Sequence, residues 1–191
     1  MLIFERDIYS GLALIMTPVC KSLQPEDFKG KHLMQLIQIV SKIHEAGVLH
    51  LDLRPRANIL IFNDSLYVVD FGFSQFNDEE NTCNAGATVF GSDKMAEMIL
   101  KETPYEPRCC DDWHSVCKII YFVSGNKERI HAVNAIDSKN YDIISTFWNK
   151  TFSEMPHYKE LLTTIDKDNE EATVRAMVEF VRVHVGLLTV R

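Results

Sequence analysis

One stretch, residues 50–72, constrains this chain more than any other. It holds two apolar segments, 59–62 and 66–69, separated by Asn63-Asp64-Ser65. The segments are rich in β-branched and aromatic residues, and the three residues between them favour turns. The stretch therefore predicts a short β-hairpin with a turn at residues 63–65.

Polar residues lie at the two ends of this predicted hairpin. Asp52 and Asn58 come just before its first strand, and Asp70 comes directly after its second. Carboxylate and amide oxygens are hard ligands that suit Mg²⁺. Arg54 adds a planar cation that matches phosphate oxygens. A proton acceptor, metal ligands and a cation at one edge of a small sheet favour phosphoryl transfer.

These residues resemble two motifs of eukaryotic protein kinases, the catalytic loop H-R-D-L-K-P-x-N and the later D-F-G. The resemblance implies that Asp52 is the catalytic base and that Arg54 contacts the transferred phosphoryl group. It implies that Asn58 and Asp70 bind Mg²⁺, and that both residues, with Gly72, belong to the ATP site. His50 takes a structural role beneath the metal-binding loop.

The stretch departs from the kinase pattern at three points. Leu51 replaces the usual Arg, and Arg54 replaces the usual Lys. Five residues separate Asp52 from Asn58 where the family has four. If the added residue bulges outward, Asn58 keeps the ligand position; otherwise Ala57 takes it.

Residues 74–91, a polar stretch after the D-F-G motif, match the position of the family's activation segment. Because Leu51 cannot dock a phosphate, we expect that phosphorylating Thr82, Thr88 or Ser92 does not order this segment through the usual route. Residues 91–97 resemble the family's G-T-x-x-Y-x-A-P-E, shortened and without the Pro. Glu97 would then be a structural acid buried against an Arg.

The beginning of the chain resembles the end of a kinase small lobe. Residues 1–5 and 12–16 read as two strands around the turn residues Ser10-Gly11. Residues 13–18 are similar to the last small-lobe strand running into the hinge, where backbone groups of Met16 and Thr17 would bind adenine. Pro18 lacks an N–H to donate.

The chain has no Gly-rich loop and no V-A-I-K lysine. We therefore expect a small-lobe remnant at 1–19 and a kinase-like large lobe at 20–191. The fold class is α+β, mainly helical with short hairpins.

Three longer segments predict helices of the large lobe. In residues 28–46, Leu33, Leu36, Ile37, Val40 and Ile43 share one face, and Gly47 can end the helix. Residues 111–123 are apolar nearly all round, as in a buried helix, and resemble the D-x-W-S-x-G helix opening, where Asp112 would hold the catalytic-loop backbone. Residues 142–152 and 170–185 complete the lobe, with Asn169 a plausible cap.

Cys110, His114 and Cys117 share a helix face at i, i+4 and i+7. The spacing can suggest zinc, but a structural site needs a fourth ligand. Buried thiols and a core histidine are the favoured interpretation.

Composition narrows the function classes. The chain has 191 residues and a net charge of −7 with interspersed signs, which argues against a general nucleic-acid surface. It contains no apolar run that could span a bilayer. Five cysteines without disulfide spacing favour a cytoplasmic or nuclear location.

Three functions stay open. The first is an ATP- and Mg²⁺-dependent protein Ser/Thr kinase, truncated at the small lobe and weakly active or inactive alone. The basic-Pro pair at residues 54–55 resembles serine/threonine kinases more than tyrosine kinases. The second is a pseudokinase, a binding module that docks another kinase or a partner protein. The third is a small-molecule phosphotransferase.

Overall fold

The computed structural model describes residues 2–6, 12–16, 19–77 and 86–185, with side chains described over 19–77 and 86–185. The strands are β1 (Leu2–Arg6), β2 (Leu12–Met16), β3 (Lys21–Ser22), β4 (Val48–Leu49), β5 (Ile59–Phe62), β6 (Ser65–Val68) and β7 (Gln75–Phe76). The helices are η1 (Pro25–Asp27), α1 (Gly30–Glu45), α2 (Asp93–Lys101), α3 (Cys109–Val123), α4 (Lys127–Asn134), α5 (Tyr141–Ser153), α6 (Pro156–Ile165), α7 (Glu170–Phe180) and η2 (Val181–Val185).

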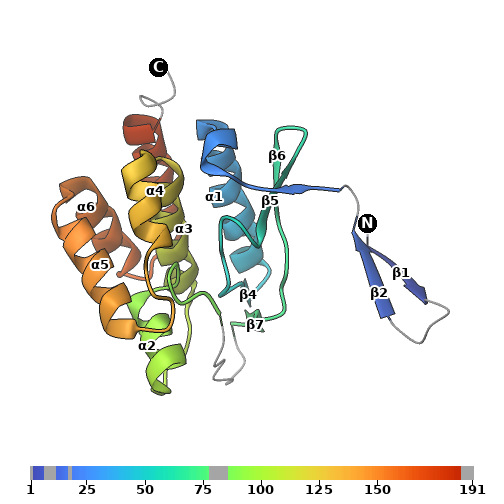
Figure 1. Cartoon of the computed structure of the whole chain (residues 1–191), viewed down its shortest axis with the longest axis horizontal. Helices are drawn as coiled ribbons and strands as arrows, with labels where there is room; N and C mark the ends of the chain where they lie inside the picture. The colour runs from blue at the N-terminus through green and yellow to red at the C-terminus, as the bar shows by residue number, and fades with distance from the viewer. Residues whose placement is uncertain (1, 7–11, 17–18, 78–85, 186–191) are drawn as a thin grey trace.

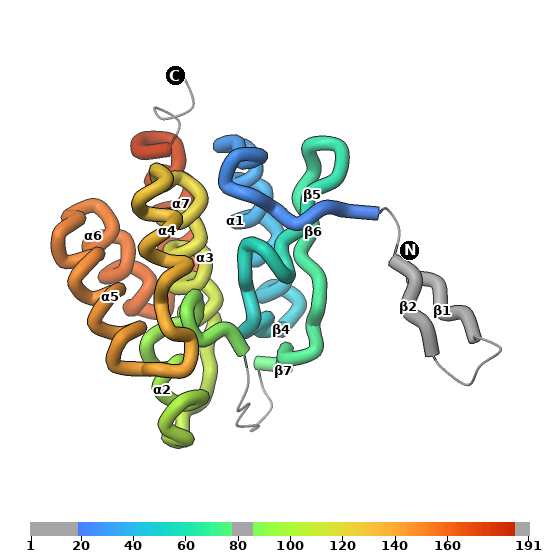
Figure 2. Tube along the Cα trace, in the orientation of Figure 1, coloured from blue at the N-terminus to red at the C-terminus, as the bar shows by residue number. Residues whose placement is uncertain are grey.

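The described strands form three small antiparallel sheets. β1 pairs with β2, as the sequence predicts, and β3, β5 and β6 form a three-stranded sheet in that spatial order. β4 pairs with β7 at the lower end of α1 in Figure 2. These short sheets beside a helical body confirm the α+β class.

Helix α1 confirms the predicted apolar face. Leu33, Leu36, Ile37 and Val40 are buried along it, and Ile43 is half-buried. The helix begins at Gly30 rather than at residue 28, because Lys29 is extended and its backbone N–H donates to the His32 ring at 3.1 Å. Gly47 follows the helix with φ +73°, a conformation that glycine adopts without strain.

Helix α3 is the centre of the helical body. All of its residues except Cys109 and His114 are buried, as expected for a helix that is apolar nearly all round. It packs against α1, α4, α6 and α7, while the β5–β6 hairpin lies on the other side of α1 (Figure 1). One continuous apolar core joins these elements. Helix α3 therefore gives a rigid support to residues 50–72, the expected catalytic stretch.

The C-terminal helices follow the sequence prediction in part. Asn169 caps α7, with its side chain accepting from the Ala172 N–H at 2.9 Å, but the α-helical geometry ends at Phe180 and η2 continues with π geometry. Helices α2, α4 and α6 were not expected from sequence. Within the described residues, no helix has the length and apolarity required to cross a membrane.

Candidate active site

The hairpin predicted from sequence brings the expected site residues to one end. Asn63 and Asp64 form its turn, both with positive φ, and Ser65 already pairs with Phe62. The turn is therefore two residues long, not the three expected, because Asn and Asp tolerate the left-handed conformation that tight hairpins require.

Pairing continues past the ends of the two strands. The Val69 N–H donates to the Asn58 carbonyl oxygen at 2.9 Å, in the same register as the pair Ile59–Val68. Asn58 and Val69 thus lie opposite each other. Asp70, the next residue, leaves the hairpin at the same end as Asn58.

The Asp52 side chain is the buried centre of this end, with 1% exposure. Its Oδ2 accepts from Asn58 Nδ2 at 2.6 Å and from an Arg54 amino group at 2.6 Å. Asn58 Nδ2 also donates to the Asp52 carbonyl oxygen at 2.7 Å. Oδ1 is buried and has no hydrogen-bond partner among the described residues, which is an unfavourable state for a carboxylate oxygen.

The local backbone determines whether Asn58 or Ala57 lies beside Asp52. The N–H groups of Ala57 and Asn58 both donate to the Arg54 carbonyl oxygen, at 3.3 and 3.0 Å. Residues 54–58 therefore form a helical turn that absorbs the added residue. Asn58, and not Ala57, reaches Asp52.

Arg54, expected to contact a phosphoryl group, pairs in the structure with the carboxylate of Asp52 at 2.6 Å. The Arg54 side chain is 44% exposed. A guanidinium has five N–H donors, so this residue can hold Asp52 and still present donors to a phosphate group.

Asp112 anchors the start of the catalytic stretch, as expected from sequence. Its two carboxylate oxygens accept the backbone N–H groups of His50 at 2.7 Å and Leu51 at 2.8 Å. Leu51 has φ +63°, a left-handed conformation that costs a non-glycine residue about 1–3 kcal/mol. The charged acceptor offsets this strain and fixes the backbone that leads to Asp52.

His44 on α1 holds Asp112 in turn. His44 Nε2 lies 3.0 Å from Asp112 Oδ2, and Nδ1 lies 3.0 Å from Glu170 Oε1. Burial alone would lower the pKa of His44, but hydrogen bonds to Asp112, Cys109 and Glu170 raise it to about 11. Without a metal, these acceptors therefore favour the protonated form of His44. It lies four residues after Val40 on the apolar face, a signal that sequence reasoning missed.

His50 and Phe71 connect the catalytic stretch to the segment after the hairpin. His50 Nε2 donates to the Val69 carbonyl oxygen at 3.2 Å, and Nδ1 accepts the Asp52 N–H at 3.3 Å. The Phe71 ring lies 4.7 Å from the His50 ring. His50 therefore has the structural role that was expected.

Asp70 combines an exposed carboxylate with a left-handed backbone, φ +64°. Its Oδ1 accepts the Gly72 N–H at 3.4 Å. Such an accessible carboxylate, on the same hairpin end as Asn58, is placed to bind a cation. Among the remaining expected site residues, Met16 ends β2 and its side chain lies outside the described ones, as does the whole of Thr17.

Leu51 takes a new role in place of the family's Arg. Its side chain is buried in an apolar cluster with Leu49 of β4 and with Met95 and Met98 of α2. The segment around α2 is therefore joined to the catalytic stretch by apolar packing. Of the residues whose phosphorylation the sequence analysis considered, Thr88 donates its hydroxyl hydrogen bond to the Ser138 carbonyl oxygen, and Thr82 lies outside the described residues.

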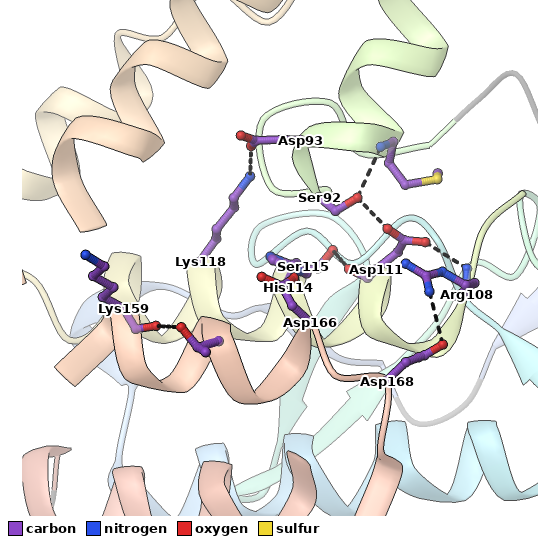
Figure 3. Close-up of polar contacts among 12 residues, drawn as sticks. Ser92, Asp93, Arg108, Asp111, His114, Ser115, Lys118, Lys159, Asp166 and Asp168 are labelled. Carbon is purple, nitrogen blue, oxygen red and sulfur yellow. Dashed lines mark hydrogen bonds and ion pairs between the residues drawn. The ribbon is translucent and has the colours of Figure 1, made fainter. Parts of the chain in front are cut away.

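The expectation for Glu97 was wrong. Its side chain is 40% exposed and pairs with Lys101 at 3.6 Å on the same helix, because position 97 falls on the outer face of α2. The buried acid here is Asp111 of α3, which accepts from Ser92 Oγ and from the Arg108 backbone N–H (Figure 3). It also accepts from the Tyr105 hydroxyl. Burial raises the pKa of Asp111 against these hydrogen bonds.

The favoured reading of Cys110, His114 and Cys117 is confirmed in part. Both thiols are buried, and burial raises the pKa of Cys110 to about 12. His114 is not in the core, because its side chain is 18% exposed and Nε2 lies 2.8 Å from Asp166 Oδ1. In the described part of the chain, these three residues form no group of metal ligands.

Comparison with known proteins agrees with this geometry. The family described as protein kinase domain matches residues 10–179. The chain belongs to the protein kinase family. CBL-interacting serine/threonine-protein kinase 2 of Arabidopsis thaliana is 32% identical over 110 residues, covering 57% of this chain and 24% of that kinase. Mitogen-activated protein kinase HOG1 of Zygosaccharomyces rouxii is 26% identical over 195 residues, covering 90% and 44%. The chain thus spans less than half the length of these relatives.

Proposed function

We propose that this kinase domain transfers the γ-phosphoryl group of ATP to a serine or threonine hydroxyl of a protein. The observation that carries the proposal is the buried Asp52 carboxylate, with Oδ2 held by Asn58 and Arg54 and with Oδ1 unpaired among the described residues. An unpaired buried acceptor is retained where it has a task. Taking a hydroxyl proton is the task that suits this one.

The described side chains fit Mg²⁺ and the ATP phosphates. Asp52 O and Oδ2 can only accept, so the Asn58 NH₂ faces them and the Asn58 amide oxygen is the atom left for a cation. Asp70 supplies an exposed carboxylate. These are oxygen ligands of the kind that Mg²⁺ takes. When bound, Mg²⁺ would be held by the Asn58 amide oxygen and the Asp70 carboxylate and would neutralise phosphate charge.

In the proposed transfer, the substrate hydroxyl oxygen bonds to the γ-phosphorus, and the bond from that phosphorus to the β–γ bridging oxygen breaks. ADP leaves, and the hydroxyl proton moves to the Asp52 carboxylate. Arg54 orients the Asp52 carboxylate and presents its guanidinium to the phosphoryl oxygens.

The N-terminal part completes this proposal. Residues 1–19 would be the remnant of the small lobe and hinge, with Met16, Thr17 and Gly72 near the nucleotide, and residues 20–191 the large lobe.

The names of both relatives support a protein substrate over a small molecule, and the name of the Arabidopsis relative specifies serine/threonine. The described cysteines Cys109, Cys110 and Cys117 form no disulfide. Reduced cysteines at these positions agree with a cytoplasmic or nuclear location.

A binding module is the second candidate, and exposed aromatic side chains favour it. Phe71 is 47% exposed, Phe73 39% and Phe76 54%. Phe71 also lines an apolar hollow of about 330 Å³ with Ile39, Ile43 and Val48. Apolar surface of this kind suits a protein partner, such as the small lobe of another kinase.

Thermal unfolding with and without ATP separates the two candidates. A nucleotide site predicts a Mg²⁺-dependent rise in melting temperature that Asp70→Asn abolishes. Transfer of radiolabelled phosphate to a Ser/Thr-containing protein should be lost in Asp52→Asn. An unchanged melting temperature at millimolar ATP rejects the nucleotide site and leaves the binding module.

A further inference from the structure

Three helix ends meet beneath the catalytic stretch and bring together three different metal-ligating groups. His44 lies in the last turn of α1, Cys109 is the first residue of α3 and Glu170 is the first residue of α7. One ligand atom from each lies within 4.8 Å of the other two. We propose that His44 Nδ1, Cys109 Sγ and Glu170 Oε1 form a zinc site, with water as the fourth ligand, and that zinc binding releases the protons of Nδ1 and of the thiol to solvent.

The ligand set selects the metal. An imidazole nitrogen, a thiolate and a carboxylate are the three side-chain ligands that Zn²⁺ uses. The hard cations Mg²⁺ and Ca²⁺ take oxygen ligands and are disfavoured by the sulfur and nitrogen atoms. The site is therefore chemically distinct from the proposed Mg²⁺ position at Asn58 and Asp70.

The distances leave room for one ion. Ligand atoms on a tetrahedral zinc ion, with bonds of about 2.0–2.3 Å, stand about 3.3–3.7 Å apart. His44 Nδ1 and Glu170 Oε1 are 3.0 Å apart, and all pairs lie within 4.8 Å. Adjustments of about 1 Å in side chains suffice.

Outer contacts already orient two of the ligands. His44 Nε2 faces the Asp112 carboxylate at 3.0 Å, which leaves Nδ1 pointing at the proposed ion. The Trp113 indole N–H donates to Glu170 Oε2 at 2.7 Å, which leaves Oε1 on the side of His44. A carboxylate behind a ligating histidine and a donor behind a ligating carboxylate are the outer contacts that zinc sites use.

The acidic side chains and the solvent exposure around His44, Cys109 and Glu170 agree with a bound cation. Asp112 and Glu170 flank His44, and the N-terminal ends of α3 and α7 favour negative ligands. The Glu170 side chain is 36% exposed and Cys109 is half-buried, whereas the His44 side chain is 2% exposed. Solvent therefore reaches the exposed side of the group, where the water ligand would bind.

Zinc at this point would fasten α1, α3 and α7 beneath the catalytic stretch. Because His44 also holds Asp112, and Asp112 holds the His50 and Leu51 N–H groups, the ion would stiffen the support of the loop. This role does not depend on phosphoryl transfer, so the site can exist whether or not the chain binds ATP.

Cobalt substitution tests the site with a readout that reports the ligands. The full chain, reduced and treated with a chelator, is titrated with Co²⁺ and then with Zn²⁺. We expect one Co²⁺ per chain, with tetrahedral d–d bands and a thiolate-to-cobalt charge-transfer band, both removed by one equivalent of Zn²⁺. Cys109→Ser should abolish the charge-transfer band, and Glu170→Gln should weaken binding at least tenfold.

Cys110→Ala is the matched control, because the neighbouring thiol lies outside the proposed site, and it should keep both bands. Circular dichroism confirms that each variant is folded. The proposal is overturned if wild type shows no stoichiometric cobalt spectrum at micromolar metal. It is equally overturned if the charge-transfer band survives Cys109→Ser.

Discussion

The anchoring of the catalytic stretch by Asp112 yields the sharpest stability prediction. Asp112→Asn keeps the shape of the side chain but removes its charge. An amide has one oxygen acceptor and an NH₂ donor, so it can satisfy only one of the N–H groups of His50 and Leu51, now bound at 2.7 and 2.8 Å. It also leaves His44 with one carboxylate partner instead of two.

The magnitude follows from these contacts. Hydrogen bonds to a charged group contribute about 1.5–3 kcal/mol each, and breaking a buried ion pair by removing one partner costs about 3–5 kcal/mol. We therefore expect Asp112→Asn to lower the free energy of unfolding by about 3–5 kcal/mol. The strained φ of Leu51 then lacks its compensation, so the loop should loosen before the chain unfolds.

Urea unfolding measures the global loss, and hydrogen exchange of the His50 and Leu51 amides measures the local one. Asp166→Asn is the matched control. Like Asp112, Asp166 pairs with a histidine, in this case His114 of α3, but the Asp166 side chain is 64% exposed. An exposed pair contributes less than about 1 kcal/mol. The anchoring role of Asp112 is refuted if the free energy of unfolding of Asp112→Asn lies within about 1 kcal/mol of the wild-type value and the His50 and Leu51 amides exchange at their wild-type rates.

Three further predictions concern other contacts. The pKa of His44 is raised to about 11 in the folded chain, so its contribution to stability is complete below the unfolded pKa of about 6.5 and is lost as pH rises toward 11. Wild type should lose stability between pH 7 and pH 10 more steeply than His44→Gln, and parallel urea midpoints across that range would contradict this. Asn58→Ala removes two hydrogen bonds to Asp52 and should cost about 1–3 kcal/mol and abolish any Mg²⁺–ATP shift in melting temperature; an unchanged shift would exclude Asn58 as a ligand. Glu97→Gln should change the unfolding free energy by less than about 0.5 kcal/mol, since the side chain is exposed, and a loss above 2 kcal/mol would restore the buried-acid role.

The sequence was most informative where a local pattern determines the structure. The apolar stripe of Leu33, Leu36, Ile37 and Val40 predicted the buried face of α1, and the segments around Asn63-Asp64 predicted the hairpin. Both depend on periodicity and turn chemistry within a few residues. Helix α4 was missed because Val133 is its one buried residue, so it carries almost no amphipathic signal.

The candidate site likewise has features that the sequence predicted and features that it could not predict. The order of Asp52, Asn58 and Asp70 along the chain was enough to expect them at one hairpin end. Whether Asn58 or Ala57 faced Asp52 could not be read from sequence, because the answer depends on the helical turn at residues 54–58. The His44–Asp112–Glu170 contacts join residues up to 126 positions apart, and such pairs leave no local signal.

Leu51 stands where the family motif has Arg, and the structure explains this departure better than the sequence does. From the sequence, Leu51 indicated only the loss of a charge that docks a phosphate. In the structure, Leu51 packs with Met95 and Met98 of α2. The same position thus still joins the catalytic stretch to the segment that follows it, through burial of apolar surface instead of charge.

The central claim is that Asn58 and Asp70 form one metal–nucleotide site beside Asp52. Nuclear magnetic resonance with Mn²⁺–ATP as a paramagnetic probe tests this most directly, since only amides close to the ion lose their signals. We predict simultaneous broadening of the Asp52, Asn58, Asp70 and Gly72 amides, and its loss in Asp70→Asn. Broadening confined to other residues, or sharp signals for all four amides at saturating Mn²⁺–ATP, would contradict the account.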